Sequence, residues 1–209
     1  MLSKKALGAS SAAPRKPKAL AVGTDSSPFL VVYSWGPSGG FGGVYSNPAT
    51  LPAGTCVDLA FSPDSSVLAA TMNSTPFVTA YAWSDSGFGT RYTNPATLPP
   101  ATGNGVAFSP LGDAIAVAHQ TSPFITVYPW SNSTGFGTKF ANPATLPTGQ
   151  GFGVAFSPNG SSIAVSHNIT PFVTAYPWSG SGFGTKYANP STLPVSTGNG
   201  VAFGSITLT

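Results

Sequence analysis

The chain has 209 residues, a length that suits one or two domains. Only 6% of the residues are charged, against roughly 25% in ordinary soluble proteins, and no glutamate is present. Hydrophobic residues at 41% and aromatic residues at 12% exclude a disordered chain, so we expect a folded protein with a surface of Ser, Thr, Asn and Gly.

Basic residues gather at the start of the chain. Residues 1–18 combine them with Ala, Ser, Gly and Pro and show no apolar period, which predicts a flexible basic arm. The rest of the chain has three basic and five acidic residues, so a nucleic-acid partner is not expected there. No apolar run reaches 18 residues, so membrane insertion is not expected either. The basic residues of the arm, which we take as an anchor, are Lys4, Lys5, Arg15, Lys16 and Lys18.

From residue 19 onward the sequence repeats itself about every 47 or 48 residues. Each unit has a Ser/Thr-Pro-Phe segment, a tryptophan, and an Asn-Pro-Ala-Thr-Leu-Pro segment or a close variant of it. An Ala-Phe-Ser-Pro segment occurs three times, and a last partial copy begins at Ala202. A repeat of this length, built from short strand-like runs, is typical of a propeller blade. The repeated aromatic residues that we expect in the core are Trp35, Trp83, Trp130, Trp178, Phe61, Phe108, Phe156 and Phe203.

The third unit shows how a blade divides into strands. It predicts four of them, at residues 105–108, 114–119, 124–130 and 135–140, with Pro and Gly between them. Both alternating side-chain sets of the third strand are largely apolar, which predicts a sheet packed between two neighbours. The fold class is therefore all-β, a β-propeller of four-stranded antiparallel blades.

The ends of the chain do not coincide with blade boundaries. Three complete blades cover about 53–99, 100–147 and 148–194, and the fourth is split between about 19–52 and 195–209. We expect residues 198–207 to pair with the sheet of residues 19–47 and so to remove exposed strand edges. Pairing within one chain gives a four-bladed ring, and pairing between two chains gives an eight-bladed dimer. The sequence leaves both open.

Candidate sites are sparse. Gly36-Pro-Ser38-Gly-Gly40 fits a hydrolase nucleophile pattern but is followed by no helix, so we interpret it as a loop. His119 and His167 recur in adjacent units without converging carboxylates, which favours a turn-stabilising role, and Asp58 alone is too little to hold a cation. No cofactor and no metal are expected. Two further sets of residues recur. The tyrosines Tyr33, Tyr81, Tyr128 and Tyr176 are more typical of core than of a sugar-stacking platform. The cations Arg91, Lys139 and Lys186 recur on the expected fourth strand, which favours guards of an exposed strand edge.

The Ala-Phe-Ser-Pro turns at 60–64 and 155–160 resemble those of WD-repeat β-propellers, although the Gly-His and Trp-Asp pairs of that family are missing. The combination of the three repeated segments resembles propeller repeats in structural proteins of tailed bacteriophages. This resemblance implies a non-enzymatic virion protein, associated with capsid or tail proteins and anchored by its arm. The alternative is a host-recognition module that binds a cell-surface glycan or receptor.

Overall fold

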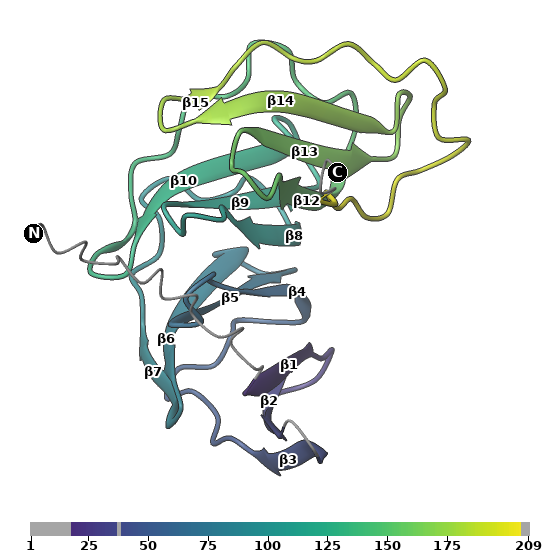
Figure 1. Ribbon diagram of the computed structural model, residues 1–209. Helices are drawn as coiled ribbons and strands as arrows, with labels where there is room; N and C mark the ends of the chain where they lie inside the picture. The colour runs from purple at the N-terminus through teal and green to yellow at the C-terminus, as the bar shows by residue number, and fades with distance from the viewer. Residues whose placement is uncertain (1–17, 37–38, 206–209) are drawn as a thin grey trace, which may run out of the picture.

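The computed structural model describes residues 18–36 and 39–205, and within them every regular element is a β-strand. The strands form one sheet of three and three sheets of four, all antiparallel, so the predicted blades are confirmed (Figure 1). In chain order the sheets are β1 (Ala19–Gly23), β2 (Leu30–Gly36), β3 (Gly40–Val44); β4 (Cys56–Phe61), β5 (Val67–Met72), β6 (Val78–Ser84), β7 (Gly87–Arg91); β8 (Gly103–Phe108), β9 (Ala114–His119), β10 (Ile125–Ser131), β11 (Gly135–Phe136); and β12 (Gly151–Phe156), β13 (Ser162–His167), β14 (Val173–Ser179), β15 (Gly182–Phe183).

The sheets, called blades 1 to 4 here, lie side by side in an open arc (Figure 1). The first strands of the blades line one side of the arc, where β4 contacts β1 and β8, and β8 contacts β12. The first and last blades stand at opposite ends and do not meet. This arrangement is that of a β-propeller whose ring of blades is not closed.

The core lies between blades. Each contact joins a face of small and aliphatic side chains on one blade to a face with tyrosine and tryptophan on the next. Between blades 2 and 3, Val67, Ala69 and Ala80 pack against Tyr128 and Trp130. Equivalent clusters join blade 1 to blade 2 and blade 3 to blade 4. Both faces of an inner blade are therefore buried, as the apolar pattern of the third strand predicts.

Each inner tryptophan is surrounded by three rings. Trp130 has Tyr92 of the preceding blade at a centroid distance of 4.9 Å, Phe108 at 5.5 Å and Phe136 at 5.0 Å, all edge to face. Trp83 and Trp178 each have three aromatic rings at the equivalent positions, two in their own blade and one in the preceding blade. The structure thus places Trp83, Trp130, Trp178, Phe61, Phe108 and Phe156 in the interblade core.

A buried serine organises the turn between the first two strands of a blade. The Ser109 hydroxyl donates to Asp113 Oδ1 at 2.6 Å and accepts from the backbone N–H groups of Asp113 and Ala114 at 3.1 and 3.0 Å. Ser62 and Ser157 make the equivalent bonds in blades 2 and 4. The repeated Ala-Phe-Ser-Pro segment therefore serves to hold this turn.

Replacing Ser109 by alanine is expected to lower the free energy of unfolding by about 1–3 kcal/mol, because buried N–H groups lose their acceptor. Urea unfolding followed by tryptophan fluorescence measures the loss. Ser86→Ala is the control, since Ser86 is exposed and such surface changes stay within about 0.5 kcal/mol. Equal stability of Ser109→Ala and the unmodified protein would contradict this role of the hydroxyl.

At Gly105 the first strands of blades 3 and 4 approach so closely that only glycine fits. A Cβ on Gly105 of β8 would lie 2.5 Å from the carbonyl oxygen of Phe152 and 3.1 Å from the Cα of Gly153. We therefore expect Gly105→Ala to lower the free energy of unfolding by about 1–3 kcal/mol, because backbone on both strands must move. Gly43→Ala is the matched control, because a Cβ on this strand glycine meets nothing within 4 Å. A loss no larger for Gly105→Ala than for Gly43→Ala in urea unfolding would argue against close packing of β8 on β12.

The expected pairing of residues 198–207 with the sheet of residues 19–47 is wrong for the single chain, as far as the described residues show. The first sheet has three strands, and residues 198–205 form no strand. They lie instead beside blade 4, where the Gly198 N–H donates to the carbonyl oxygen of His167 at 3.1 Å. The physical reason is the arc: three interblade cores fix the blades at angles that leave blade 1 away from blade 4.

Candidate functional site

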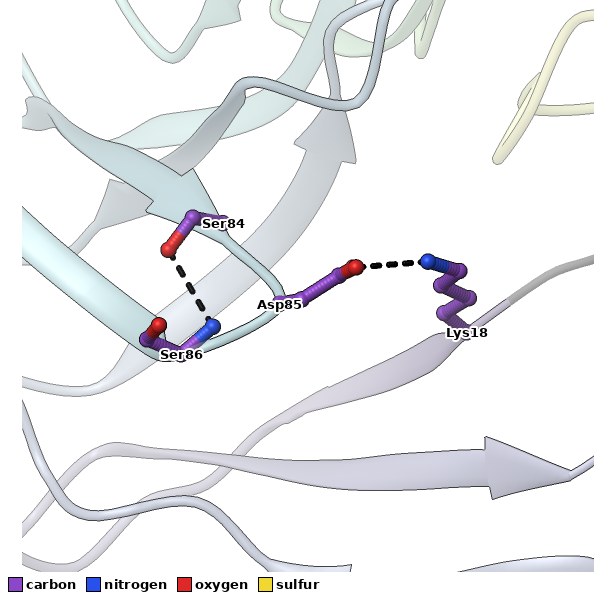
Figure 2. A network of polar contacts seen from close by, with 4 residues as sticks. All are labelled: Lys18, Ser84, Asp85 and Ser86. Atoms are coloured by element: carbon purple, nitrogen blue, oxygen red, sulfur yellow. Dashed lines mark hydrogen bonds and ion pairs between the residues drawn. The ribbon is translucent and has the colours of Figure 1, made fainter.

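Lys18 is the one proposed anchor residue that the structure describes; Lys4, Lys5, Arg15 and Lys16 lie outside the described residues. Its carbonyl oxygen accepts from the Trp35 N–H at 2.8 Å, so it extends the pairing of β1 with β2. Its ammonium group lies 2.6 Å from the Asp85 carboxylate in the turn between β6 and β7 (Figure 2). The same turn is held by the Ser86 N–H, which donates to the Ser84 hydroxyl at 3.2 Å. Lys18 thus belongs to the first blade rather than to a separate arm.

The two histidines are fully buried at the ends of β9 and β13. His119 Nδ1 is 2.8 Å from the Thr121 carbonyl oxygen and Nε2 is 2.9 Å from the Thr126 hydroxyl, so Nδ1 carries the proton. Burial lowers the pKa of His119 to about 4, and the Lys139 charge acts in the same direction. His167 Nε2 makes the equivalent contact with Thr174, and burial lowers its pKa too. His119 therefore supports the turn after β9, and each histidine binds a threonine of the next strand. The buried Nδ1 of His167 has no hydrogen-bond partner among the described residues.

Asp58 is a bridge between two blades. Its half-buried carboxylate accepts from the Val106 N–H at 2.9 Å, which ties β4 to β8. Burial raises the pKa of Asp58, and hydrogen bonds from the backbone of Val106 and Leu59 oppose the rise. The described residues contain no group of three or more His, Cys, Asp or Glu side chains that could hold a metal ion.

The three cations expected on fourth strands bind the repeated Asn-Pro segments. Of the three, Arg91 lies in its strand, β7, whereas β11 and β15 end before Lys139 and Lys186, so the expected strand 135–140 is shorter in the structure. Lys186 Nζ donates to Asn189 Oδ1 at 2.6 Å, and the Lys139 and Arg91 side chains bind Asn142 and Asn94 in the same way. From the sequence we expected guards of an exposed strand edge at these positions and did not predict this contact. The signal was the constant spacing of three residues between each cation and its asparagine.

The repeated tyrosines form no sugar-binding platform in the inner blades. Tyr81, Tyr128 and Tyr176 are fully buried, and Tyr128 donates its hydroxyl to the Thr97 carbonyl oxygen at 2.7 Å. The segment with the hydrolase-like pattern connects β2 to β3, two strands of one hairpin, and its Ser38 lies outside the described residues. The buried tyrosines of the inner blades therefore offer no surface for sugar stacking.

A shallow hollow of about 120 Å³ lies between the turns of blades 2 and 3. Asp64 lines it and accepts from Ser62, Ser66 and Asn132, the last across the two blades at 2.8 Å. Burial alone would raise the pKa of Asp64, but these hydrogen bonds outweigh it and hold the pKa at about 2. The carboxylate is already engaged in holding the two blades together.

The strongest candidate for an interaction surface is the pair of open ends of the arc. At the blade 1 end, Trp35 and Tyr33 are only half-buried, whereas their counterparts Trp130 and Tyr128 are buried. At the blade 4 end, Phe203 is 37% exposed and Tyr187 is 47% exposed. These are the same residue types that fill the core between inner blades.

Comparison with known proteins supports the fold and no more. No family profile and no curated protein matches the chain. Among solved structures, the hydrazine synthase of Kuenenia stuttgartiensis matches with a TM-score of 0.51 and 14% identity. The match covers 69% of this chain and 38% of that chain, so this chain spans well under half of its length. As 672 solved chains match, the fold itself selects no function. No helix among the described residues could cross a membrane.

Proposed function

We propose that the chain is a non-enzymatic structural protein of a tailed-phage virion, anchored to capsid or tail proteins by its N-terminal arm. The observation that carries this proposal is the combination of repeated segments, which resembles propeller repeats of phage structural proteins. The structure supports it indirectly. Asp58, His119 and Lys186 each bind a neighbouring segment and so hold turns or blades together, which suits a scaffold.

Charge supports the role of the arm. Four of the eight basic residues lie within residues 1–17, and the body that follows is nearly uncharged. A basic segment next to a neutral scaffold is suited to an acidic partner surface, because opposite charges steer association. The arm is therefore the part of the chain that we assign to attachment.

Deletion of residues 1–17 tests attachment. Lys18 is kept, because it pairs with Trp35 and Asp85 and belongs to the first blade. Particles purified from the producing host should contain the full chain and lack the truncated one, while circular dichroism of the purified truncated chain stays unchanged. Replacement of Lys4, Lys5, Arg15 and Lys16 by glutamine separates charge from length. Equal incorporation of full and truncated chains would count against the anchor, and absence of the full chain from particles would count against the virion assignment.

The alternative is a host-recognition module that binds a cell-surface glycan through its loops. The exposed turns after the third strands favour this alternative, since they present hydroxyl groups that suit sugars. They include Ser84, Ser86, Ser131, Ser133, Ser179 and Ser181. A glycan array and a cell-binding assay with purified protein discriminate the two. Binding to one glycan class would favour recognition, and silence on all glycans and cells would favour the scaffold.

A further inference from the structure

We propose that two copies of this chain close one eight-bladed ring, in which residues 198–203 of each copy add the missing first strand to β1 of the other. This inference does not depend on the virion assignment. It starts from a sequence identity: residues 197–203 and 102–108 both read Thr-Gly-Asn-Gly-Val-Ala-Phe. The second of these segments contains β8 (Gly103–Phe108), which pairs with β9. Residues 197–203 have no such strand to pair with in the single chain.

The C-terminal segment already occupies the place of a first strand in a following blade. The Gly198 N–H donates to the His167 carbonyl oxygen at 3.1 Å, just as the Cys56 N–H at the start of β4 donates to the Thr24 carbonyl oxygen at 3.2 Å. A Cβ on Gly153 would lie 3.0 Å from the Gly200 Cα, much as a Cβ on Gly105 lies 3.1 Å from the Gly153 Cα. Residues 198–203 therefore follow β12 as β12 follows β8.

The missing partner of this segment is a strand like β1. Leu20 lies opposite Tyr33 in blade 1, as Ile115 lies opposite Tyr128 in blade 3, so Leu20 corresponds to Ile115. The register of β8 with β9 pairs Phe108 with Ile115 and Val106 with Val117. Transferred to the two ends of the arc, that register sets Phe203 opposite Leu20, and Val201 opposite Val22. Val22 is 41% exposed in the single chain, whereas its counterpart Val117 is fully buried.

The aromatic rings that are missing around Trp35 at one end of the arc are present at the other end. Inner tryptophans have three rings around them, but the only ring beside Trp35 among the described residues is that of Phe41, at 5.2 Å. It lacks the ring from the first strand and the ring from the preceding blade. Phe203 and Tyr187 hold those two positions at the far end of the chain, and both are exposed there. A second copy brings the two missing rings to Trp35.

The connectors between blades show the same imbalance. Pro48, Pro95 and Pro143 of the Asn-Pro segments are buried. The same segments contact the blade that follows, since Tyr128 and Tyr176 donate their hydroxyls to the carbonyl oxygens of Thr97 and Thr145. Pro190 at the equivalent place after blade 4 is exposed, because no blade follows it in the single chain. Likewise Val173 of β14 is half-buried where Val78 and Ile125 are fully buried. Blade 4 thus presents the aliphatic face, and blade 1 the tyrosine and tryptophan face, of one uncompleted core.

A second copy is favoured over closure within one chain. Bringing blade 1 to blade 4 in the same chain would require repacking all three interblade cores, and close-packed cores resist such change. A second copy can meet both free ends of the arc that Figure 1 shows, and it completes the fourth core without repacking the other three. Propellers typically have four to eight blades. With four blades in each chain, a ring of two copies is the largest ring that stays within this range. The two identical junctions are related by a two-fold axis.

A cysteine pair tests the register directly. In Val22→Cys/Val201→Cys the two thiols lie opposite each other on paired strands, at a Cα separation that a disulfide tolerates. Mild oxidation should give a species of twice the chain mass on a non-reducing gel, while Val22→Cys or Val201→Cys alone should give none. Cys56 does not compete, because burial and the nearby Asp58 raise its pKa to about 12. A disulfide within one chain, or no disulfide, would overturn the proposal.

A charged substitution where β1 is proposed to pair with residues 198–203 of the other copy provides the second test. Val22→Asp places a carboxylate between β1 and the incoming strand, so sedimentation velocity should show the single-chain mass. Leu111→Asp is the control, because Leu111 is 81% exposed in a turn away from both ends and its variant should keep the two-chain mass. Circular dichroism checks that both variants are folded. A folded Val22→Asp protein that stays at the two-chain mass would refute the proposed pairing of β1 with residues 198–203.

Discussion

Trp130→Ala is expected to lower the free energy of unfolding by about 3–5 kcal/mol, the range for truncating a large buried aromatic side chain. Trp130 is 5% exposed, has three rings around it and donates its indole N–H to Asn132 Oδ1 at 2.9 Å. The substitution removes the centre of the core between blades 2 and 3. Urea unfolding monitored by circular dichroism measures the loss.

Trp35→Ala is the matched control for this prediction. The comparison belongs in the Val22→Asp background, where the ends of the arc are expected to be free and Trp35 keeps only Phe41 beside it among the described residues. There the substitution should cost clearly less than Trp130→Ala. Equal losses at the two positions would mean that Trp35 is packed like an inner tryptophan, which contradicts the open arc.

The protein is expected to lose up to about 3 kcal/mol of its unfolding free energy between pH 6.5 and 4, because His119 is buried without charge. Its pKa falls from 6.5 to about 4 on folding, and each pKa unit corresponds to about 1.4 kcal/mol. The unfolded chain therefore takes up the proton first as the pH falls. Stability is complete above pH 6.5, declines below it and levels off below about pH 4. His167, whose pKa is also lowered, adds to the decline.

The chain supplies its own control for the histidines. Met72 occupies the equivalent position in blade 2 and is fully buried. His119→Met/His167→Met should therefore fold and should show a much flatter unfolding free energy between pH 6.5 and 4 in urea titrations at successive pH values. An unchanged pH profile in the double variant would assign the acid sensitivity to other groups.

Much of the fold follows from the repeats, and the reason is physical. Alternating apolar residues in the third strand require neighbours on both faces, so the interblade core around Trp130 could be predicted without coordinates. The pairing of the chain ends could not be predicted, because the same residues could close a ring within one chain or between two chains. What decides between them is the angle between blades, which depends on how side chains such as Tyr92 and Trp130 fit together.

The candidate sites were harder to predict, because repeated polar residues signal structure as readily as function. His119, Asp58 and Lys139 each bind the backbone or a side chain of a neighbouring segment, and only the three-dimensional contacts reveal it. Lys18 shows the same effect, since its charge suggested an arm while its contacts place it in blade 1. Sequence composition predicted an arm and a body but could not set the boundary between them to a residue.

Native mass spectrometry of the unmodified chain at micromolar concentration tests the two-copy ring most directly. The expected result is a dominant species at twice the 21.1 kDa chain mass, which dilution converts to single chains without larger assemblies. A single-chain mass at every concentration, or a ladder of ever larger assemblies, would show that the exposed ends of the arc do not join in a closed pair.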